Sequence, residues 1–359
     1  MIVLHVIPGL SAAQGGLQGA LLNLCRAQQA SGITPVIAAL HEDSPPDAAF
    51  SAFETHLFDC TFRPTGASRD MKDWLRLHAD KYQAVIAHSL WRDPLLYAAE
   101  AASPLIVVAH GMLDPEALGH RAWRKLWRLR MKLPDVLRRA TVVYTCAAEQ
   151  QRSHTGPGGS AKTSAVIPLC VDVPAAPPDQ SPDGPIMVLG RIHPRKGTLE
   201  WVRALCLMAQ QGTGFTAMHA GPAEDRAYAR SVYAAAEPLQ GKLIFKGALP
   251  DSQAQALLAR ARIVVAPCAV RENFGMVIAE AMANARPVVA GRRGLIVPEL
   301  EAAGAVTGAD HEPQAYAAAM RAVFAHPERT AMRGHNFASR HYALPVVGAS
   351  WRGLLGTVG

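Results

Sequence analysis

Two glutamates stand eight positions apart where a loop is expected to become a helix. Residues 271–283 read RENFGMVIAEAMA, with Glu272 in the loop and Glu280 in a helix that we expect to begin near Gly275. The first turn of a helix directs unpaired backbone N–H groups and a positive dipole end toward a nearby anion. Glu280 could then accept hydrogen bonds from a ribose diol, while Glu272 could reach a sugar. The alternative is an ordinary helix start with acidic residues near it.

A basic loop precedes this segment in the chain. Residues 190–197 read GRIHPRKG, after an apolar run at 186–189 and before a helical pattern of apolar residues. An open α/β sheet presents charge to phosphate in this way, at the carboxyl ends of its strands. Arg191 and Lys196 could therefore bind a diphosphate. Basic loop residues are more often simply solvated, but the order of the two segments favours the functional interpretation.

Three weaker signals lie in the first half of the chain. Gly15 and Gly16 follow the first apolar run, so a phosphate or sugar could approach their backbone closely. His110 ends a second apolar run, and the pair His88 and Ser89 ends another. Each pattern is also common in purely structural positions.

Both halves of the chain alternate short apolar runs with helical patterns. This alternation is typical of right-handed βαβ units and a parallel sheet. Between the halves, residues 168–185 contain six prolines. We therefore expect an N-terminal Rossmann-like domain over 1–170, a linker over 171–185 and a C-terminal Rossmann-like domain over 186–335. A strand is expected near Phe215, and residues 336–359 should form a terminal helix.

Five segments in this order resemble the retaining glycosyltransferases of family 4. They are residues 8–16, AHGMLDP at 109–115, GRIHPRKG at 190–197, FKGALPD at 245–251 and the two glutamates of 272–280. The resemblance covers almost the whole chain and implies the GT-B fold, in which two Rossmann-like domains face a central cleft. The HGMLDP segment is most similar to the bacterial branch that builds capsule, exopolysaccharide or O-antigen chains. Ala285 and Ala109 depart from the family, which usually has Gly and, in this branch, Pro there.

The resemblance also implies roles for individual residues. Arg191, Lys196, Glu272 and His110 are the expected catalytic residues, and His88 with Ser89 would line the acceptor side. The terminal helix would cross back to the first domain. The expected donor-binding residues are Gly15, Gly16, Gly190, Lys246, Asn273, Phe274, Gly275, Met276, Val277 and Glu280.

Together these observations predict transfer of a hexose from a UDP- or GDP-linked sugar to a hydroxyl of a glycan or lipid-linked sugar. Retention of anomeric configuration and a part in cell-surface polysaccharide biosynthesis follow from the resemblance alone. A sugar-nucleotide epimerase of the same fold would share the donor site without needing a second sugar. A catalytically silent nucleotide-sugar-binding protein is the other alternative.

Several other classes of protein lack their usual signals here. No D-x-D sequence is present, so we expect no metal, and no other cofactor, with cationic side chains neutralising the diphosphate. The serine-hydrolase elbow and the Walker A pattern are also missing. The six cysteines form no C-x-x-C pair, which favours a reducing compartment. With no signal-peptide pattern and no long apolar run, we expect a cytoplasmic protein.

The positive charge of the chain is concentrated in residues 121–139. This segment carries eight Arg or Lys and one Asp, and its net charge equals the +7 of the whole chain. Two tryptophans and several leucines accompany the charges, so we expect a basic amphipathic helix, or a helix pair broken at Pro134. It could be a solvated face, or it could dock reversibly on the anionic inner membrane, which binding to anionic vesicles at low and high salt would test. No nucleic-acid-binding module is recognisable, so nucleic acid is not an expected partner.

Overall fold

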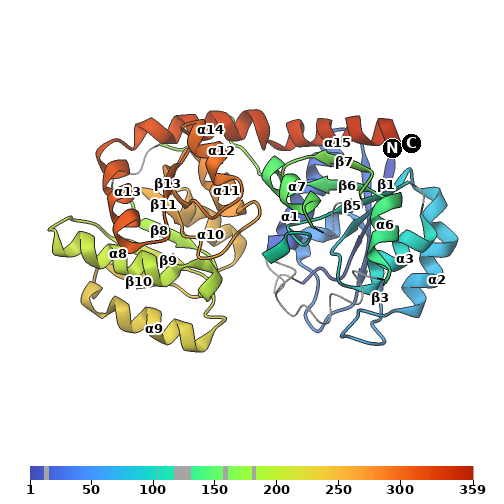
Figure 1. The fold of residues 1–359 in the computed structure, drawn as a ribbon, viewed down its shortest axis with the longest axis horizontal. Helices are drawn as coiled ribbons and strands as arrows, with labels where there is room; N and C mark the ends of the chain where they lie inside the picture. The colour runs from blue at the N-terminus through green and yellow to red at the C-terminus, as the bar shows by residue number, and fades with distance from the viewer. Residues whose placement is uncertain (12–15, 103, 117–130, 157–160, 180–182, 359) are drawn as a thin grey trace. The chain divides into compact units, whose positions relative to one another are not determined.

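The chain folds into two compact units. We describe it from a computed structural model that places residues 1–359 except 12–15, 103, 117–130, 157–160, 180–182 and 359. Unit 1 comprises Met1–Cys170 together with Leu344–Gly359, and unit 2 comprises Val171–Ala343. Figure 1 shows the helices and strands of each unit.

Unit 1 is built on a seven-stranded sheet with the order β3-β2-β1-β4-β5-β6-β7, and every pairing between these strands is parallel. Parallel strands are buried on both faces, which explains why they read as continuous apolar runs. The strands are β1 (Ile2–Ile7), β2 (Thr34–Leu40), β3 (Glu54–Phe58), β4 (Ala84–His88), β5 (Leu105–Val108), β6 (Thr141–Tyr144) and β7 (Thr163–Val166).

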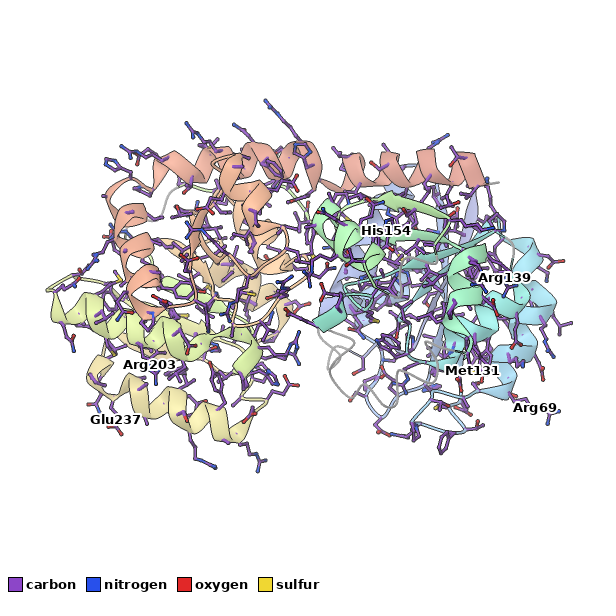
Figure 2. All side chains as sticks on the ribbon, in the orientation of Figure 1. Arg69, Met131, Arg139, His154, Arg203 and Glu237 are labelled. Carbon is purple, nitrogen blue, oxygen red and sulfur yellow. The ribbon has the colours of Figure 1, made fainter. Side chains whose placement is uncertain are left out.

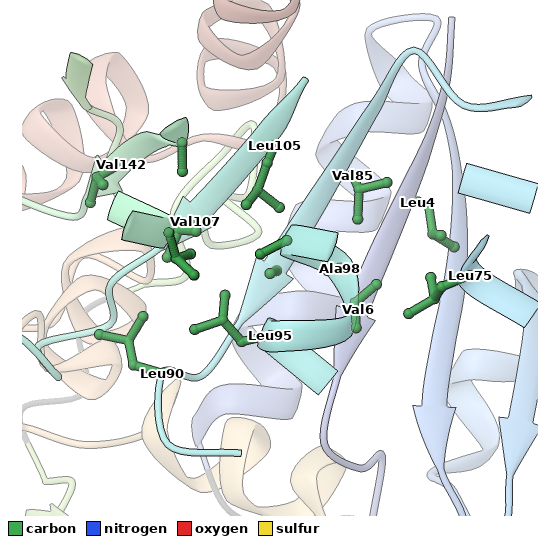
Figure 3. Close-up of a cluster of buried hydrophobic side chains, with 14 of the residues drawn as sticks. Leu4, Val6, Leu75, Val85, Leu90, Leu95, Ala98, Leu105, Val107 and Val142 are labelled. Atoms are coloured by element: carbon green, nitrogen blue, oxygen red, sulfur yellow. The ribbon is translucent and has the colours of Figure 1, made fainter. Parts of the chain in front are cut away.

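Helices cover both faces of this sheet. The buried side chains of α2, α3 and α6 pack with one set of strand residues, and those of α1 and α15 pack with the alternate set. Figure 3 shows the first of these clusters, including Leu4, Val85, Val107 and Leu95. The helices of unit 1 are α1 (Gly16–Ala30), α2 (Arg69–His78), α3 (Asp93–Ala101), α6 (Leu133–Arg139), α7 (Ala147–His154) and α15 (Leu344–Val358), with short 3₁₀ turns at Ala48–Ala52 and Ala79–Lys81.

Unit 2 repeats the scheme with six parallel strands in the order β10-β9-β8-β11-β12-β13. The strands are β8 (Ile186–Leu189), β9 (Ala217–Ala220), β10 (Leu243–Phe245), β11 (Ile263–Ala266), β12 (Val288–Gly291) and β13 (Thr307–Ala309). The helices are α8 (Thr198–Gln210), α9 (Arg226–Ala236), α10 (Asp251–Leu258), α11 (Met276–Ala283), α12 (Val297–Ala302), α13 (Pro313–Ala325) and α14 (Glu328–His341), with 3₁₀ turns at Pro194–Lys196 and Glu237–Leu239.

This architecture confirms the expected fold class of two Rossmann-like parallel sheets flanked by helices. Some expected elements differ in their bounds. The strand expected near Phe215 begins at Ala217, and the C-terminal region holds α14 and α15 where one helix was expected over 336–359. Tyr342 and Ala343 separate these two helices, and α15 belongs to unit 1.

The basic segment is only partly described, because residues 117–130 lie outside the described residues. Pro134 lies in the first turn of α6, where its missing N–H costs no hydrogen bond, and α6 begins just after a turn at Lys132. A helix pair separated at this point stays a prediction, because most of its first helix falls on residues outside the described ones. Figure 2 shows Met131 and Arg139 at the surface of unit 1, and Met131 is 63% exposed. In the part of the chain that the structure places, no helix is both long and apolar enough to cross a bilayer.

Candidate functional site

The carboxyl ends of β8 and β11 define the candidate site of unit 2. The chain runs outward from β8 through β9 to β10, then returns to place β11 on the other side of β8. In open α/β sheets this reversal of strand order opens a crevice where ligands bind. The loops that follow β8 and β11 are the two that the sequence analysis singled out.

Lys196 and Glu272 meet at this edge. They are 76 positions apart, yet Lys196 Nζ donates a hydrogen bond to the Glu272 carboxylate in a partly exposed ion pair. Lys196 ends the 3₁₀ turn after β8, where Gly197 takes a left-handed conformation with φ 69°. The backbone carbonyl of Glu272 also accepts a hydrogen bond from the N–H of Leu295, at 2.9 Å, which fixes its loop against the loop after β12.

Arg191 is held by a different carboxylate. Its guanidinium forms an exposed ion pair with Glu224, in the loop after β9. These strand ends lie very close together, since a Cβ on Gly221 would be 1.9 Å from the carbonyl oxygen of Gly190. Arg191 and Lys196 therefore both lie at the expected edge, each already neutralised by an acid.

Helix α11 begins beside Glu272. Its N-cap is Gly275, whose φ of 70° is left-handed and which has no side chain to cap the first turn. The N–H groups of the first turn are therefore in place to face an anion. A small pocket lies at this point, lined by Ala266, Cys268, Glu272, Phe274, Gly275, Val277, Ile278, Gly291 and Gly294.

Glu280 lies in the second turn of α11. Burial raises the pKa of its carboxyl group, a hydrogen bond with Gln255 of α10 acts in the opposite direction, and the charge of Asp251 raises it further. A contact between Glu280 and a ribose stays a prediction. So do donor contacts by Lys246, which is exposed just after β10, and by Asn273 and Met276.

Two charged residues of this edge were missed by the sequence analysis. Glu224 neutralises Arg191, and Arg293 donates a hydrogen bond to the carbonyl of Ala269, in the loop that carries Glu272. The available signal was their position, because each follows the apolar run of a strand, but their sequence neighbours match no motif. Within the described part of the chain, no three His, Cys, Asp or Glu side chains gather as they would around a metal ion.

Unit 1 presents a different arrangement around His110. His88 Nδ1 lies 3.0 Å from His110 Nε2, and His88 Nε2 lies 2.9 Å from His5 Nδ1. His5 Nε2 in turn lies 2.7 Å from Gln28 Oε1, in α1. The structure thus brings together His88 and His110 and adds His5 and Gln28, which the sequence analysis did not single out.

Burial keeps these imidazoles neutral. It lowers the pKa of His5 to about 4, against a smaller opposing effect of the hydrogen bond to Gln28. It also lowers the pKa of His110 to about 4. The pKa of His88 lies well below 6.5, first because of burial and then because of its two histidine neighbours. Near pH 7 each ring therefore carries one proton.

The backbone at the two strand ends is unusual. Ser89 has φ 80° and His110 has φ 46°, in the left-handed region of the backbone that residues other than Gly seldom adopt. Such conformations cluster at functional sites. The loop after His110 is anchored, since the N–H of Gly111 donates to the buried Glu149 carboxylate and Asp114 forms a bidentate ion pair with Arg152. An acceptor contact by His88 or Ser89 stays a prediction, and His88 itself is only 1% exposed.

His88 and His110 also line an apolar pocket of unit 1. Its other lining residues are Ala20, Leu24, Val108, Val143, Ile167, Pro168, Leu169, Cys170 and Trp351. Gly15 lies outside the described residues, and Gly16 is the exposed first residue of α1. Before α1, the backbone N–H of Ser11 donates a hydrogen bond to the Glu42 carboxylate at 2.9 Å.

Two protein-family models match consecutive parts of the chain. The model described as "Glycosyltransferase Family 4" matches residues 14–174, and the one described as "Glycosyl transferases group 1" matches residues 184–326. The chain belongs to the family-4-like glycosyltransferases. The resemblance carried by the five sequence segments is thereby confirmed, and so is the general function of a glycosyltransferase.

Solved structures of similar fold are related at low sequence identity. HepE from Anabaena, in complex with UDP and glucose, has a TM-score of 0.78 and 19% identity, over 99% of this chain and 100% of that one. Sucrose-phosphate synthase from Thermosynechococcus elongatus has a TM-score of 0.77 and 18% identity, over 99% and 98%. WaaG, a glycosyltransferase involved in lipopolysaccharide biosynthesis, has a TM-score of 0.64 and 14% identity, over 100% and 99%. A sequence search of curated proteins gave no significant match.

Proposed function

We propose that this glycosyltransferase moves a hexose from a UDP-linked sugar to a hydroxyl of a glycan or lipid-linked sugar, with retention of anomeric configuration. The observation that carries the proposal is the pairing of Lys196 with Glu272 beside the first turn of α11. It combines a cation, a carboxylate and a helix N-terminus at one strand edge. The cation and the helix N-terminus suit the phosphates of a sugar nucleotide, and the carboxylate suits the hydroxyls of its sugar.

The preference for UDP over GDP comes from similar structures. HepE from Anabaena has been solved in complex with UDP, with UDP and glucose, and with UDP-glucose. These relatives make UDP-glucose the first donor to test. A part in cell-surface polysaccharide biosynthesis is supported by the HGMLDP segment and stays a proposal.

The chemistry follows from the charges at this edge. Negative charge grows on the leaving diphosphate as its bond to the sugar breaks, and preorganised positive groups stabilise that charge most. Lys196, Arg191 and the first turn of α11 supply them. Before the donor binds, Glu272 and Glu224 hold the two cations in position, and the phosphates then compete for these cations. A phosphate oxygen of the leaving group takes the proton of the acceptor hydroxyl, so no separate protein base is needed.

Two alternatives remain distinct in experiment. A sugar-nucleotide epimerase would use the same edge and turn over donor without an acceptor. A silent binding protein would bind donor at the same cations without turnover or transfer.

The test begins with thermal stabilisation by UDP, GDP and UDP-glucose, since a ligand at 100 times its Kd stabilises by about 2.7 kcal/mol. Transfer to a panel of glycan and lipid-linked acceptors is then measured with excess EDTA present, and the anomer of the product is assigned by NMR. We expect UDP and UDP-glucose to bind and the product to keep the donor anomer. Isomerisation of the donor alone would identify an epimerase, and loss of transfer in EDTA that Mg²⁺ restores would overturn the metal-independent chemistry.

A further inference from the structure

A chain of hydrogen bonds connects the core of unit 1 to His110. It begins at Gln28 Oε1, passes through His5 and His88, and ends at His110 Nε2, with distances of 2.7, 2.9 and 3.0 Å. Gln28 and His5 are fully buried, and His88 is 1% exposed. His110 is the partly exposed member, and it lies at the end where a ligand could reach it.

The strand register explains how three histidines meet. His5 on β1 is paired with Ile86 on β4, and His88 lies two residues beyond Ile86. His88 is paired with Val108 on β5, and His110 lies two residues beyond Val108. Because side chains alternate along a strand, a step of two keeps the same face. His5 and His88 therefore lie on the same face of two adjacent strands, the face that α1 covers, and His110 follows in the turn after β5.

The positions of the protons follow from one end of this chain. A carbonyl oxygen can only accept, so Gln28 Oε1 requires a proton on His5 Nε2. A neutral imidazole has a single N–H, so His5 Nδ1 must accept, and His88 Nε2 must donate to it. By the same reasoning His88 Nδ1 accepts from His110 Nε2. Each ring then has its proton on Nε2.

We propose that Gln28, His5 and His88 are positioning residues that hold His110 in one tautomer, with its proton on Nε2 and its Nδ1 free of a proton. Nδ1 is then the ring atom that accepts a hydrogen bond from a hydroxyl of the bound sugar. The identity of that ligand rests on the proposed function. The tautomer does not, because it is set within unit 1 before any ligand binds.

This arrangement orients His110 as well as its proton. The ring is tied through Nε2 to His88, and the next residue, Gly111, is tied through its N–H to Glu149. A ring tied at Nε2, on a backbone anchored at the next residue, presents Nδ1 in one direction to the ligand. The opposite tautomer would present a donor at the same place, and it would require the amide of Gln28 to turn over, since a reversed amide reverses every proton in the chain.

The tautomer can be read directly from the protein labelled with ¹⁵N-histidine. Long-range ¹H–¹⁵N correlation spectra at pH 7.5 distinguish the two neutral tautomers, and a His110→Phe spectrum assigns the His110 ring. We expect His110 to show only the form protonated on Nε2. A proton on Nδ1, or a mixture of the two forms, in the wild-type protein would overturn the proposal.

A glutamine variant then tests the cause. Gln28→Met keeps the side-chain length and removes the acceptor, so His110 should populate both tautomers, while Gln29→Met, at the exposed neighbouring position, should leave the spectrum unchanged. His219 of unit 2 is an internal reference, because its ring nitrogens have no partner among the described residues. An unaltered His110 tautomer in folded Gln28→Met would contradict the proposal. If that variant does not fold, Gln28→Leu serves the same purpose.

Binding measurements separate this inference from the proposed function. The Kd of UDP-glucose should rise about two- to tenfold in Gln28→Met, the range of one hydrogen bond, while the Kd of UDP stays unchanged. An equal rise for both ligands would contradict a contact with the sugar. If UDP-glucose fails to bind even the wild-type protein, the proposed function fails, yet the tautomer measurement still decides whether the chain of histidines sets His110.

Discussion

The candidate residues of unit 2 carry full charges at or near the surface, whereas those of unit 1 are neutral rings largely removed from water. In unit 2, Lys196 and Arg191 are each paired with an acid, and the paired side chains are roughly one-third to one-half exposed. In unit 1, His5 and His88 are buried and bonded only to other neutral groups. Exposed ion pairs exchange partners at little cost, while buried polar groups are costly to leave unpaired. Unit 2 is thus suited to capturing an anion and unit 1 to fixing an orientation.

His219 sharpens this contrast, because it is a buried histidine without a hydrogen-bonded chain. It lies on β9 between the rings of Trp201 and Phe245, and neither ring nitrogen has a partner among the described residues. Burial lowers its pKa to about 4, as it does for His5. A buried histidine on a parallel strand is therefore part of a hydrogen-bonded chain in unit 1, whereas in unit 2 it contributes packing alone.

The largest effect is expected from breaking the charged pair. Lys196→Ala removes a donor to the developing charge of the leaving diphosphate and leaves Glu272 facing it, so kcat should fall by about 10² to 10³. Single-turnover transfer at saturating donor measures this. Arg195→Ala is the matched control, an exposed cation in the same 3₁₀ turn, and it should retain a rate close to wild type. A Lys196→Ala rate within about threefold of wild type would remove Lys196 from this role.

A smaller effect should separate the two kinds of buried histidine. His5→Leu leaves the carbonyl oxygen of Gln28 and the Nε2–H of His88 without partners, and each such group costs about 1–3 kcal/mol of unfolding free energy. His219→Leu leaves no polar partner behind in the described residues and should change stability at pH 7 by less than about 1.5 kcal/mol. Urea denaturation measures both, and hydrogen exchange in β1 and β9 assigns each loss to its unit.

The unfolding free energy of His219→Leu relative to wild type has a defined pH dependence. The pKa of His219 is lowered in the folded state, so between pH 6.5 and about 4 the unfolded chain binds a proton that the folded chain does not. Its contribution to stability is complete above pH 6.5 and is lost as the pH falls. His219→Leu cannot bind this proton in either state. When the pH falls from 7 to 5, its unfolding free energy should therefore rise relative to that of wild type by on the order of 1–2 kcal/mol. If the unfolding free energy of wild type and of His219→Leu changed equally with pH, a neutral, buried His219 would be contradicted.

The smallest effect concerns Glu224. Glu224→Gln releases Arg191 from an exposed ion pair, and such pairs contribute about 0.2–1 kcal/mol. The affinity for UDP should therefore rise by no more than about fivefold, and the gain should shrink at high salt. Calorimetric titration at two salt concentrations measures this. A large loss of affinity would instead mean that Glu224 itself contacts the nucleotide.

Much of the fold and of the unit 2 site could be predicted because both depend on local patterns. Alternating apolar runs and helical patterns specified two parallel sheets, and Lys196 and Glu272 each follow such a run. Their contact additionally requires β8 and β11 to be neighbours, which the usual order of a Rossmann-like sheet provides. The partner of Arg191 could not be predicted, because Glu224 follows β9 in a segment without a motif.

The hydrogen-bonded chain of histidines could not be predicted from the sequence, for a different reason. His88 and His110 were each noted at a strand end, but their contact depends on the register between strands, which no local pattern reports. His5 lies within an apolar run and reads as an ordinary strand residue.

The two-residue steps between paired strands constrain how this sequence can change over evolution. A single insertion or deletion within β1 or β4 would turn His5 or His88 to the opposite face of the sheet and interrupt the proton order at that point. Losing any one histidine leaves polar atoms of its neighbours without partners, so we expect His5, His88 and His110 to depend on one another. Related sequences should therefore keep all three together or replace all three together, and strand length in this part of unit 1 should tolerate less variation than the loops around it.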